Sequence, residues 1–582
     1  SKKGQKIVDM NSAAVDKGVN AAVKIDVPES WKTLADDTKA PDASLPHYIR
    51  EIQIPVNKQA GDAIPVSEFM PYADGVTPSE TSKYEKRGIA VKVPKWIPEN
   101  CIGCNKCALV CPHAAIRPFL LNAEEEAAKP AAFVTKEAKG KGFEGLTFRM
   151  QVDPLDCQGC GACANVCPAK EKALVMELLD TQMPEQENWD HALTLSTKAN
   201  PMDKFTVRGS QYERPLYEFS GACAGCGEAP YMKLMSQLFG DRMFVTSATG
   251  CAYVVGSSTP SFPYAVNEKG HGPANSNSLF EDNAEYALGM KLSIDQMRRQ
   301  MAAHAEAVVA STSDAALKSA LEAWLAEGDN GDKTRALSEA VVAALNATAE
   351  TSDDIAFLKA NKDALPKKSV WMYGGDGWAY DIGFGGLDHV LASGADVNVL
   401  VVDTEVYSNT GGQASKATQL GAVAQFANGG KRTGKKDLGA IAMTYGNVYV
   451  AQVAMGANEQ HLITALKEAE AHHGPSIIIA YAPCINHGIS KGMSQAQLEE
   501  KEASECGYWP LWRYVPELKA EGKNPFILTS KEPNGKLLDF MMGETRFASL
   551  TRTFPETAKV LFAEAEEFCA QRYAKYKHLA EQ

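Results

Sequence analysis

Two short cysteine runs carry the clearest chemical signal in this chain of 582 residues. Each run follows the pattern C-x2-C-x2-C-x3-C-P, and the runs span residues 101–112 and 157–168. This pattern is typical of bacterial domains that hold two [4Fe-4S] clusters, in which the fourth cysteine of each run ligates the other run's cluster. The spacing therefore predicts one cluster on Cys101, Cys104, Cys107 and Cys167, and a second on Cys157, Cys160, Cys163 and Cys111.

Zinc is the alternative occupant of these runs. Structural zinc sites usually combine two C-x2-C pairs across a longer loop, whereas here four cysteines fall within eleven residues twice over. The first residues, Ser1-Lys2-Lys3-Gly4, have no apolar export signal behind them, so clustered cysteines favour metal ligands over disulfides. Two clusters a short distance apart would conduct electrons.

Four further cysteines form a looser set. Their 2+1+1 spacing is unlike that of the two runs, so the kind of metal stays open here. Buried structural cysteines grouped by chance are the alternative. The set that we predict as a third metal site is Cys223, Cys226, Cys251 and Cys484. Cys506 and Cys569 have no partner at ligand spacing, and we interpret them as free thiols.

A glycine-rich motif and a later loop resemble the thiamine-diphosphate signature. Gly375-Asp376-Gly377 is followed after 26 residues by the segment 404–412, Thr-Glu-Val-Tyr-Ser-Asn-Thr-Gly-Gly. Mg²⁺ prefers oxygen ligands and bridges diphosphates. Asp376 can supply a carboxylate, Thr404 a hydroxyl and Val406 a backbone carbonyl, while the glycines let backbone N–H groups approach phosphates. Gly-Asp-Gly alone is also a common turn, so the prediction depends on the second segment.

The elements that must position these residues are the strands of an α/β sheet. From about residue 215, β-branched runs end in Gly, Ser, Thr or Asn loops and alternate with helical patterns, which predicts a doubly wound, mostly parallel sheet. The expected strands are 243–246, 369–373, 397–402 and 476–481. Ligands bind beyond the carboxyl ends of such strands. Cys251, Asp376, Thr404 and Cys484 each stand at one of these ends, so we expect them to be neighbours in space.

The same patterns suggest three regions. Residues 1–90 contain several prolines and are predicted as an extended tail or linker from a preceding domain. Residues 91–200 are predicted as a small α+β ferredoxin-type domain with two clusters. Residues 201–582 are predicted as a thiamine-diphosphate- and Mg²⁺-binding α/β domain with the third cluster beside it. An Ala-, Glu- and Lys-rich helical insertion at about 290–364 reads as a packing or subunit-contact element.

Composition excludes some function classes. The net charge of −13 argues against a general nucleic-acid binder. No run of 18 apolar residues occurs, so we expect no membrane span and a cytoplasmic protein. Basic residues precede and enter the first cysteine run and could attract an acidic electron carrier, although a solvated surface stretch explains them equally well. They are Lys83, Lys86, Arg87, Lys92, Lys95 and Lys106.

Taken in this order, the motifs resemble the C-terminal half of the pyruvate:ferredoxin (flavodoxin) oxidoreductases. The segment 277–285 is also similar to that family, whereas Asn275-Ser276 stand where Trp-Ala is expected. The resemblance implies oxidative decarboxylation of pyruvate to acetyl-CoA and CO₂. Electrons would pass through three [4Fe-4S] clusters to ferredoxin or flavodoxin, with coenzyme A as co-substrate and a homodimer as the assembly.

The resemblance also implies which residues line the cofactor. These are Glu228, Gly250, Cys251, Gly375, Asp376, Gly377, Trp378, Thr404, Glu405, Val406, Tyr407, Ser408 and Asn409. Asn409 would also lie near the substrate carboxylate and act in catalysis. Asn11 would belong to the coenzyme A site. His271 and His487 are expected close to the same place without an assigned role.

In the enzymes that this chain resembles, thiamine diphosphate lies between two α/β domains, and only one is evident here. We therefore expect a downstream portion of a longer polypeptide, whose N-terminal domains supply the other half of the site. Alternatives are a sister enzyme for 2-oxoglutarate, a branched 2-oxoacid or indolepyruvate, and a pure electron-transfer subunit. A thiamine-dependent decarboxylase without redox chemistry conflicts with twelve well-spaced cysteines.

Overall fold

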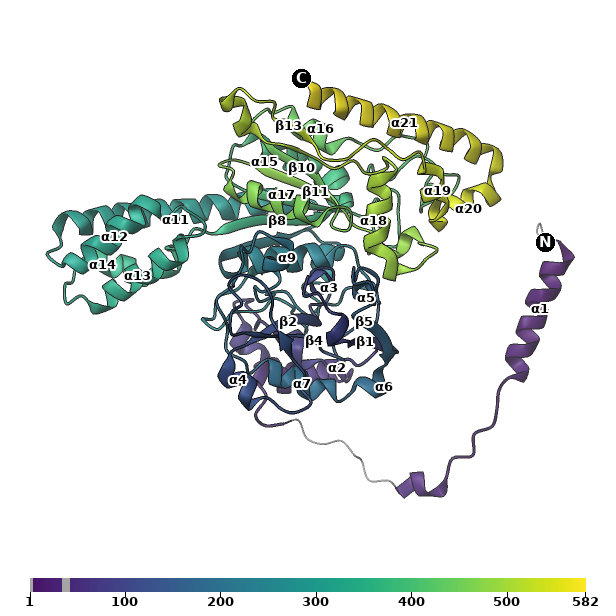
Figure 1. Cartoon of the computed structure of the whole chain (residues 1–582), viewed down its shortest axis with the longest axis horizontal. Coiled ribbons are helices and arrows are strands. Elements are labelled where there is room, and N and C mark those ends of the chain that lie inside the picture. Colours follow the sequence, from purple (N-terminus) through teal and green to yellow (C-terminus); the bar gives the residue numbers. More distant parts are fainter. Residues whose placement is uncertain (1–3, 34–41) are drawn as a thin grey trace. The chain divides into compact units, whose positions relative to one another are not determined.

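A computed structural model describes residues 4–33 and 42–582 of the chain. It comprises two compact units, Ser1–Glu68 and Phe69–Gln582, which are considered separately (Figure 1).

Part of the first unit is helical where the sequence predicted an extended tail. α1 (Gln5–Asn20) contains no proline and buries no residue. A π-helix at Tyr48–Gln53 buries Tyr48, Ile49 and Ile52 and continues into α2 (Ile54–Asn57). Pro55 stands in the first turn of α2, where the N–H that proline lacks has no helical partner in any case. The prolines therefore limit helix length here without excluding helices.

The ferredoxin-type region is built on two small antiparallel sheets. β1 (Lys92–Trp96) pairs with β5 (Leu174–Leu178), and β4 (Thr147–Val152) lies between β2 (Ile116–Leu121) and β3 (Lys136–Glu137). Each cysteine run contains one short helix, α3 (Lys106–Leu109) or α5 (Ala162–Asn165). Four further helices complete the region: α4 (Ala123–Ala128), α6 (Leu179–Gln182), α7 (Glu185–Ala192) and α8 (Val207–Ser210).

The two cysteine loops share one backbone shape. The residues at the matching positions Gly103 and Gly159 have φ of 68° and 69°, and those at Asn105 and Gly161 have φ of 61° and 81°. Glycine adopts this left-handed region without strain, and asparagine tolerates it better than most residues. The two positive-φ positions curl each loop, and the first three cysteines of each run line one cavity.

An eight-stranded sheet forms the centre of the second unit. Its order is β13-β12-β10-β11-β9-β8-β6-β7. Six strands run parallel: β6 (Met243–Ser247), β7 (Ala274–Ser276), β8 (Ser369–Gly375), β9 (Asn398–Asp403), β10 (Tyr449–Val453) and β11 (Ser476–Tyr481). β12 (Trp512–Tyr514) and β13 (Phe526–Leu528) continue the sheet antiparallel. The predicted mostly parallel α/β class is confirmed.

Helices cover both faces of this sheet, because alternate residues of its strands enter two different cores. Trp371 and Tyr373 of β8 pack in the core beneath α9 (Ala229–Phe239) and α17 (Glu459–Ala471). Val370 and Met372 pack in the opposite core. That core is covered by α15 (Phe384–Ala392), α16 (Leu438–Met443), α18 (Ala496–Glu505), α19 (Leu537–Met542), α20 (Thr545–Thr553) and α21 (Pro555–Glu581).

Four helices that follow β7 and precede β8 in the sequence form a helical arm (Figure 1). It consists of α11 (Asn283–Ser311), α12 (Ala315–Glu327), α13 (Thr334–Ala347) and α14 (Asp353–Ala360). These helices have a core of their own around Leu321 and Trp324, while Ala284 and Ala287 at the start of α11 join the core of the sheet. Across the described residues, no helix is both long and apolar enough to cross a membrane.

Candidate functional site

The cysteines of the two ferredoxin-type runs line two separate cavities. One cavity is lined by Cys101, Cys104, Cys107 and Cys167, together with Trp96, Met150 and Leu174. The other is lined by Cys111, Cys157, Cys160 and Cys163, together with Pro94, His113 and Ile116. Each cavity thus combines three cysteines of one run with the last cysteine of the other. This is the grouping that the spacing predicts, and ligation by these residues stays a prediction.

Several thiols of the two runs lie in surroundings that disfavour their ionised form. Burial raises the pKa of Cys160 to about 11 and also raises that of Cys104, so a metal that binds either sulfur must displace its proton. Among the described residues, no three His, Cys, Asp or Glu side chains are arranged to hold a single metal ion.

The looser set of cysteines also converges. Cys226 precedes α9, Cys251 begins α10 (Cys251–Val254), and Cys484 follows β11. Their charges act on one another, because Cys226 and Cys484 both raise the pKa of Cys251, and Cys223 raises that of Cys484. Gly227 N–H donates to the Pro483 carbonyl at 3.1 Å, which holds the loop of Cys226 against the loop of Cys484.

Glu228 lies beside this set and has an incomplete hydrogen-bond shell. Its side chain is buried, burial raises its pKa to about 8, and its charge acts on Cys226, Cys251 and Cys484. One carboxyl oxygen, Oε2, has no hydrogen-bond partner. Buried polar atoms are rarely left unpaired, so this oxygen fits a site for a polar group such as the predicted thiamine cofactor.

The three predicted magnesium ligands meet at one point. The Thr404 hydroxyl lies 3.1 Å from Asp376 Oδ1 and 2.9 Å from the Val406 carbonyl oxygen. Ligands on adjacent corners of an octahedron with Mg–O bonds of about 2.0–2.1 Å lie roughly 2.9 Å apart. Burial and the nearby Asp403 raise the pKa of Asp376, so a cation at this point would stabilise its ionised form. The three oxygens therefore fit a Mg²⁺ ion.

Space beside the glycines fits a diphosphate. A Cβ on Gly375 would meet nothing closer than the Val402 carbonyl at 3.8 Å, and one on Gly250 would meet only the Ala248 carbonyl at 4.0 Å. A Cβ on Gly377 would instead lie 2.7 Å from the Tyr407 ring. Gly250 and Gly375 thus leave backbone open to a ligand, whereas Gly377 makes room for packing.

Other predicted residues occupy varied positions. Trp378 is fully buried against Gly374 and Gly383. The Ser408 hydroxyl donates to Cys251 Sγ at 3.1 Å, which links the strand-end loop to the third cysteine set. Asn409 is exposed. Asn11 is exposed on α1, in the other unit, so its assignment to coenzyme A stays a prediction.

A buried ion network supports the loop that follows β9. Lys435 lies 2.7 Å from Asp403 and 2.9 Å from Glu405, and Arg546 lies 2.9 Å from Glu405. Although burial opposes it, these two cations lower the pKa of Glu405 to about 2. The Glu405 carboxylate, which the resemblance places at the cofactor, is therefore engaged by protein cations.

Sequence reasoning did not find Lys435, Arg546 or Ser415. Ser415 donates to Asp376 Oδ2 at 2.5 Å and so completes the shell of that carboxylate. The contacts join residues 30 or more positions apart, and no local motif marks them.

The two histidines noted in the sequence differ in position. Burial lowers the pKa of His487 to about 3, so its neutral ring donates through Nε2 to the Thr404 carbonyl at 2.6 Å. Nδ1 faces the Cys484 N–H at 3.5 Å. His487 thus joins the loop of Thr404 to the loop of Cys484. Burial and the charge of Arg335 lower the pKa of His271, and no hydrogen bond or ion pair joins its ring to the site in the described part of the chain.

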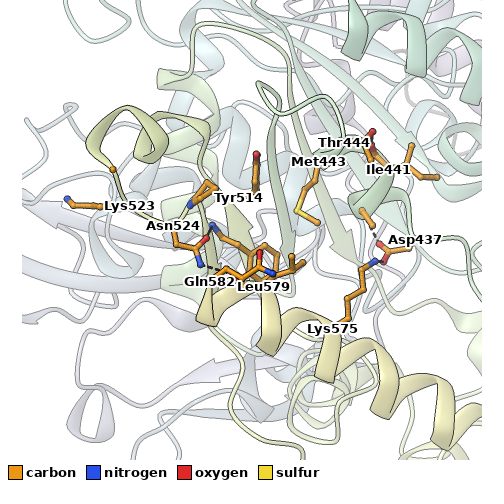
Figure 2. Close-up of a pocket in the computed structure, with 14 residues that line it drawn as sticks. Asp437, Ile441, Met443, Thr444, Tyr514, Lys523, Asn524, Lys575, Leu579 and Gln582 are labelled. Carbon is orange, nitrogen blue, oxygen red and sulfur yellow. Dashed lines mark hydrogen bonds and ion pairs between the residues drawn. The ribbon is translucent and has the colours of Figure 1, made fainter.

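A separate groove contains none of the predicted site residues. Figure 2 shows this groove of about 870 Å³ between α16, the segment around β13 and the end of α21. Lys575 crosses its edge to Asp437 at 3.2 Å.

Family comparisons agree with the geometry. Residues 99–170 match a family described as a 4Fe-4S dicluster domain, and residues 340–480 match the C-terminal thiamine pyrophosphate-binding domain of thiamine pyrophosphate enzymes. Residues 36–90 match a domain of unknown function. The predicted iron–sulfur and thiamine-binding domains are confirmed at this level.

Curated relatives match the entire chain. It is 55% identical to a pyruvate:ferredoxin oxidoreductase of Moorella thermoacetica, over 100% of this chain and 50% of that protein. It is 52% identical to a pyruvate-flavodoxin oxidoreductase of Klebsiella pneumoniae, over 99% of this chain and 49% of that protein. The chain is a homologue of the C-terminal portion of pyruvate:ferredoxin (flavodoxin) oxidoreductases.

A relative named as a different enzyme also matches the whole chain. The chain is 44% identical to a mitochondrial pyruvate dehydrogenase [NADP(+)] of Euglena gracilis, over 100% of this chain and 32% of that protein. The chain spans about half the length of the pyruvate:ferredoxin (flavodoxin) oxidoreductases that it matches, and less of this longer protein.

The two glycines of the Gly-Asp-Gly motif give a first test. We expect Gly375→Ala to leave stability unchanged but to weaken Mg²⁺-dependent thiamine diphosphate binding at least about tenfold, because its methyl group would enter the open space. Gly377→Ala should lower the free energy of unfolding by about 1–3 kcal/mol through overpacking against Tyr407. Calorimetric binding and chemical denaturation measure the two effects. Equal losses of stability in both variants would contradict the prediction.

Proposed function

We propose that this chain is the cluster- and diphosphate-binding portion of an enzyme that oxidatively decarboxylates pyruvate to acetyl-CoA and CO₂. One observation carries the proposal: Ser408 donates to Cys251, and His487 joins the loop of Thr404 to the loop of Cys484. A thiamine site and an electron acceptor in contact suit oxidation of a 2-oxoacid. The names of the relatives support pyruvate as the acid.

Three [4Fe-4S] clusters are proposed as the electron path. The proximal cluster would be held by Cys223, Cys226, Cys251 and Cys484 beside the cofactor site. The two ferredoxin-type cavities would hold the others, with the ligands described above. Since α3 and α5 pack in the same core as α9, which follows Cys226 directly, this core offers a short route between the proximal and the outer clusters.

Asp376, Thr404 and the Val406 carbonyl are proposed to hold the Mg²⁺ of thiamine diphosphate, and Gly250, Gly375 and Gly377 to border its phosphates. When bound, the cofactor supplies the carbon nucleophile and the electron sink for decarboxylation. The protein's part is positional. Ser415 orients Asp376, and His487 fixes the Thr404 carbonyl. Asn409 is proposed near the substrate carboxylate, and Asn11 at the coenzyme A site.

A further polypeptide region is proposed to complete the site. The relatives are about twice as long as this chain, and one thiamine-binding domain is matched here. Their additional half would supply the remaining face of the cofactor site and the substrate pocket, in a homodimeric assembly. Substrate choice among 2-oxoacids would then rest mainly outside this chain.

Ferredoxin or flavodoxin is proposed as the electron acceptor, as the relatives' names indicate. The basic residues around the first cysteine run contribute less free charge than their number suggests. Lys83, Lys86 and Lys106 lie 2.6 Å from Glu80, Asp153 and Glu459 respectively, and Arg87 pairs with Glu85. This pairing favours a solvated, largely neutralised surface over a strongly attracting one.

The proximal cluster predicts a specific loss of iron. Wild-type protein prepared without oxygen should contain about twelve irons per chain, and Cys484→Ala about eight, because one [4Fe-4S] cluster is lost. Cys506→Ala is the matched control and should leave iron unchanged, since Cys506 is buried in the core on the opposite face of the sheet from Cys226 and lines neither cysteine cavity. Iron and acid-labile sulfide assays with low-temperature EPR measure this. Twelve irons in Cys484→Ala would rule out the ligand assignment.

The magnesium site predicts a loss of cofactor affinity. Asp376→Asn keeps the shape of the side chain but removes its charge, so thiamine diphosphate binding in the presence of Mg²⁺ should weaken at least about tenfold. Asp388→Asn serves as the control, because the Asp388 carboxylate accepts a hydrogen bond from Tyr445. Titration calorimetry follows both. Absent binding in wild type and variant alike would favour a pure electron-transfer subunit.

The activity itself is tested with the complete enzyme. Joined to the missing half, the chain should reduce ferredoxin or flavodoxin with pyruvate and coenzyme A, and faster than with 2-oxoglutarate, branched 2-oxoacids or indolepyruvate. The chain alone should give no pyruvate-dependent reduction, because half of the cofactor site is absent. A preference for another 2-oxoacid would replace pyruvate with that substrate, and turnover by the chain alone would refute the need for a partner region.

A further inference from the structure

Lys233 is a buried cation on α9, the helix that follows Cys226 and Glu228. Its side chain is only 1% exposed. The ammonium group donates to the Leu109 carbonyl at 2.8 Å and to the Ala108 carbonyl. These carbonyls belong to the C-terminal end of α3, the short helix inside the first cysteine run. Lys233 therefore ties the thiamine-binding region to the ferredoxin-type region.

No acidic side chain compensates this charge within the described residues. The charged or titratable groups that act on Lys233 are Cys111, Arg117 and Cys107. Arg117 is itself a cation and is already paired with Glu218. Burying an ammonium group without an anion is costly. The two carbonyls satisfy two of its hydrogen bonds, but they do not neutralise the charge.

The place of Lys233 supplies a reason for this arrangement. Cys107 lies within α3 and lines one cavity, while Cys111 follows α3 and lines the other. The carbonyls of Ala108 and Leu109 stand between them in the chain. Lys233 thus reaches the helix that carries a predicted ligand of each outer cluster.

We propose that Lys233 is the buried counter-charge of the outer clusters and raises their reduction potentials. This inference rests on the clusters of the proposed function. A cluster with four thiolates is anionic and gains one more negative charge when reduced. A buried positive charge beside it stabilises the reduced form more than the oxidised form, because water screens the attraction poorly there.

The direction of electron flow follows from this charge. Lys233 would make the outer clusters easier to reduce and so favour electron transfer away from the proximal cluster. Lys233 acts here as a positioning and electrostatic residue. A purely structural role, joining α3 to α9 by hydrogen bonds, would depend on donors and shape and would leave the potentials unchanged.

Three substitutions separate charge from shape. Lys233→Met keeps the linear shape without charge or donors, Lys233→Gln keeps amide donors without charge, and Lys233→Arg keeps the charge. Lys106→Gln is the matched control, because Lys106 lies on α3 but is partly exposed and already paired with Glu459 at 2.6 Å. EPR-monitored redox titration of the anaerobically purified full chain measures each cluster's potential, and iron analysis measures its content.

We expect Lys233→Met and Lys233→Gln to lower the reduction potential of one outer cluster by at least about 59 mV. For a one-electron couple, this shift is a tenfold change in the reduction equilibrium. Lys233→Arg should retain the wild-type value, and Lys106→Gln should shift it less. Unchanged potentials in Lys233→Met and Lys233→Gln, with clusters intact, would overturn the proposal.

Loss of clusters is also informative. If the two uncharged variants lose iron while Lys233→Arg keeps it, the charge is required and the proposal stands. If all three variants lose iron, the clusters depend on the shape of the lysine side chain and not on its charge, and the proposal fails. A wild-type chain without clusters would instead refute the proposed function, so the two failures are distinguishable.

Discussion

The shared edge of a parallel sheet is the constraint on which this structure depends. β6, β8, β9 and β11 all point the same way, so their carboxyl ends deliver residues from distant parts of the chain to one place. The Gly227–Pro483 hydrogen bond then adds the Cys223–Cys226 loop to that edge. If one of these strands ran in the opposite direction, its functional side chain would leave the site.

The loops at that edge are held from beneath by paired charges. Asp403 ends β9 as a fully buried carboxylate, and its Oδ1 accepts the Glu405 N–H at 3.0 Å, which helps to set the left-handed turn at Glu405. Lys435 bridges Asp403 and Glu405. Because a buried charge is costly without its partner, this arrangement holds the loop in one conformation. The backbone carbonyls of Thr404 and Val406 are therefore fixed before any cation arrives.

Local patterns in the sequence predicted the parts of the site that depend on spacing. The cavity groupings follow from the cysteine runs, and the meeting of Asp376 with Thr404 follows from two neighbouring parallel strands. The supports of the site could not be predicted in this way. Arg546 of α20 contacts Glu405, and Lys233 of α9 contacts α3 in the ferredoxin-type region. Both contacts join residues far apart in the sequence, so only the folded chain reveals them. In residues 1–90, proline content hid helices because proline is compatible with a first helical turn.

The exchange of one cysteine between the two ferredoxin-type cavities has a consequence for assembly and damage. Cys111 belongs to the first run but lines the cavity of the second. Cys167 belongs to the second run but lines the cavity of the first. A cluster inserted into either cavity would restrain both loops and prepare the other cavity for filling. Oxidative destruction of one would, by the same connection, loosen the coordination of its neighbour. The pair would therefore mature and decay as a cooperative unit, with few molecules carrying only one.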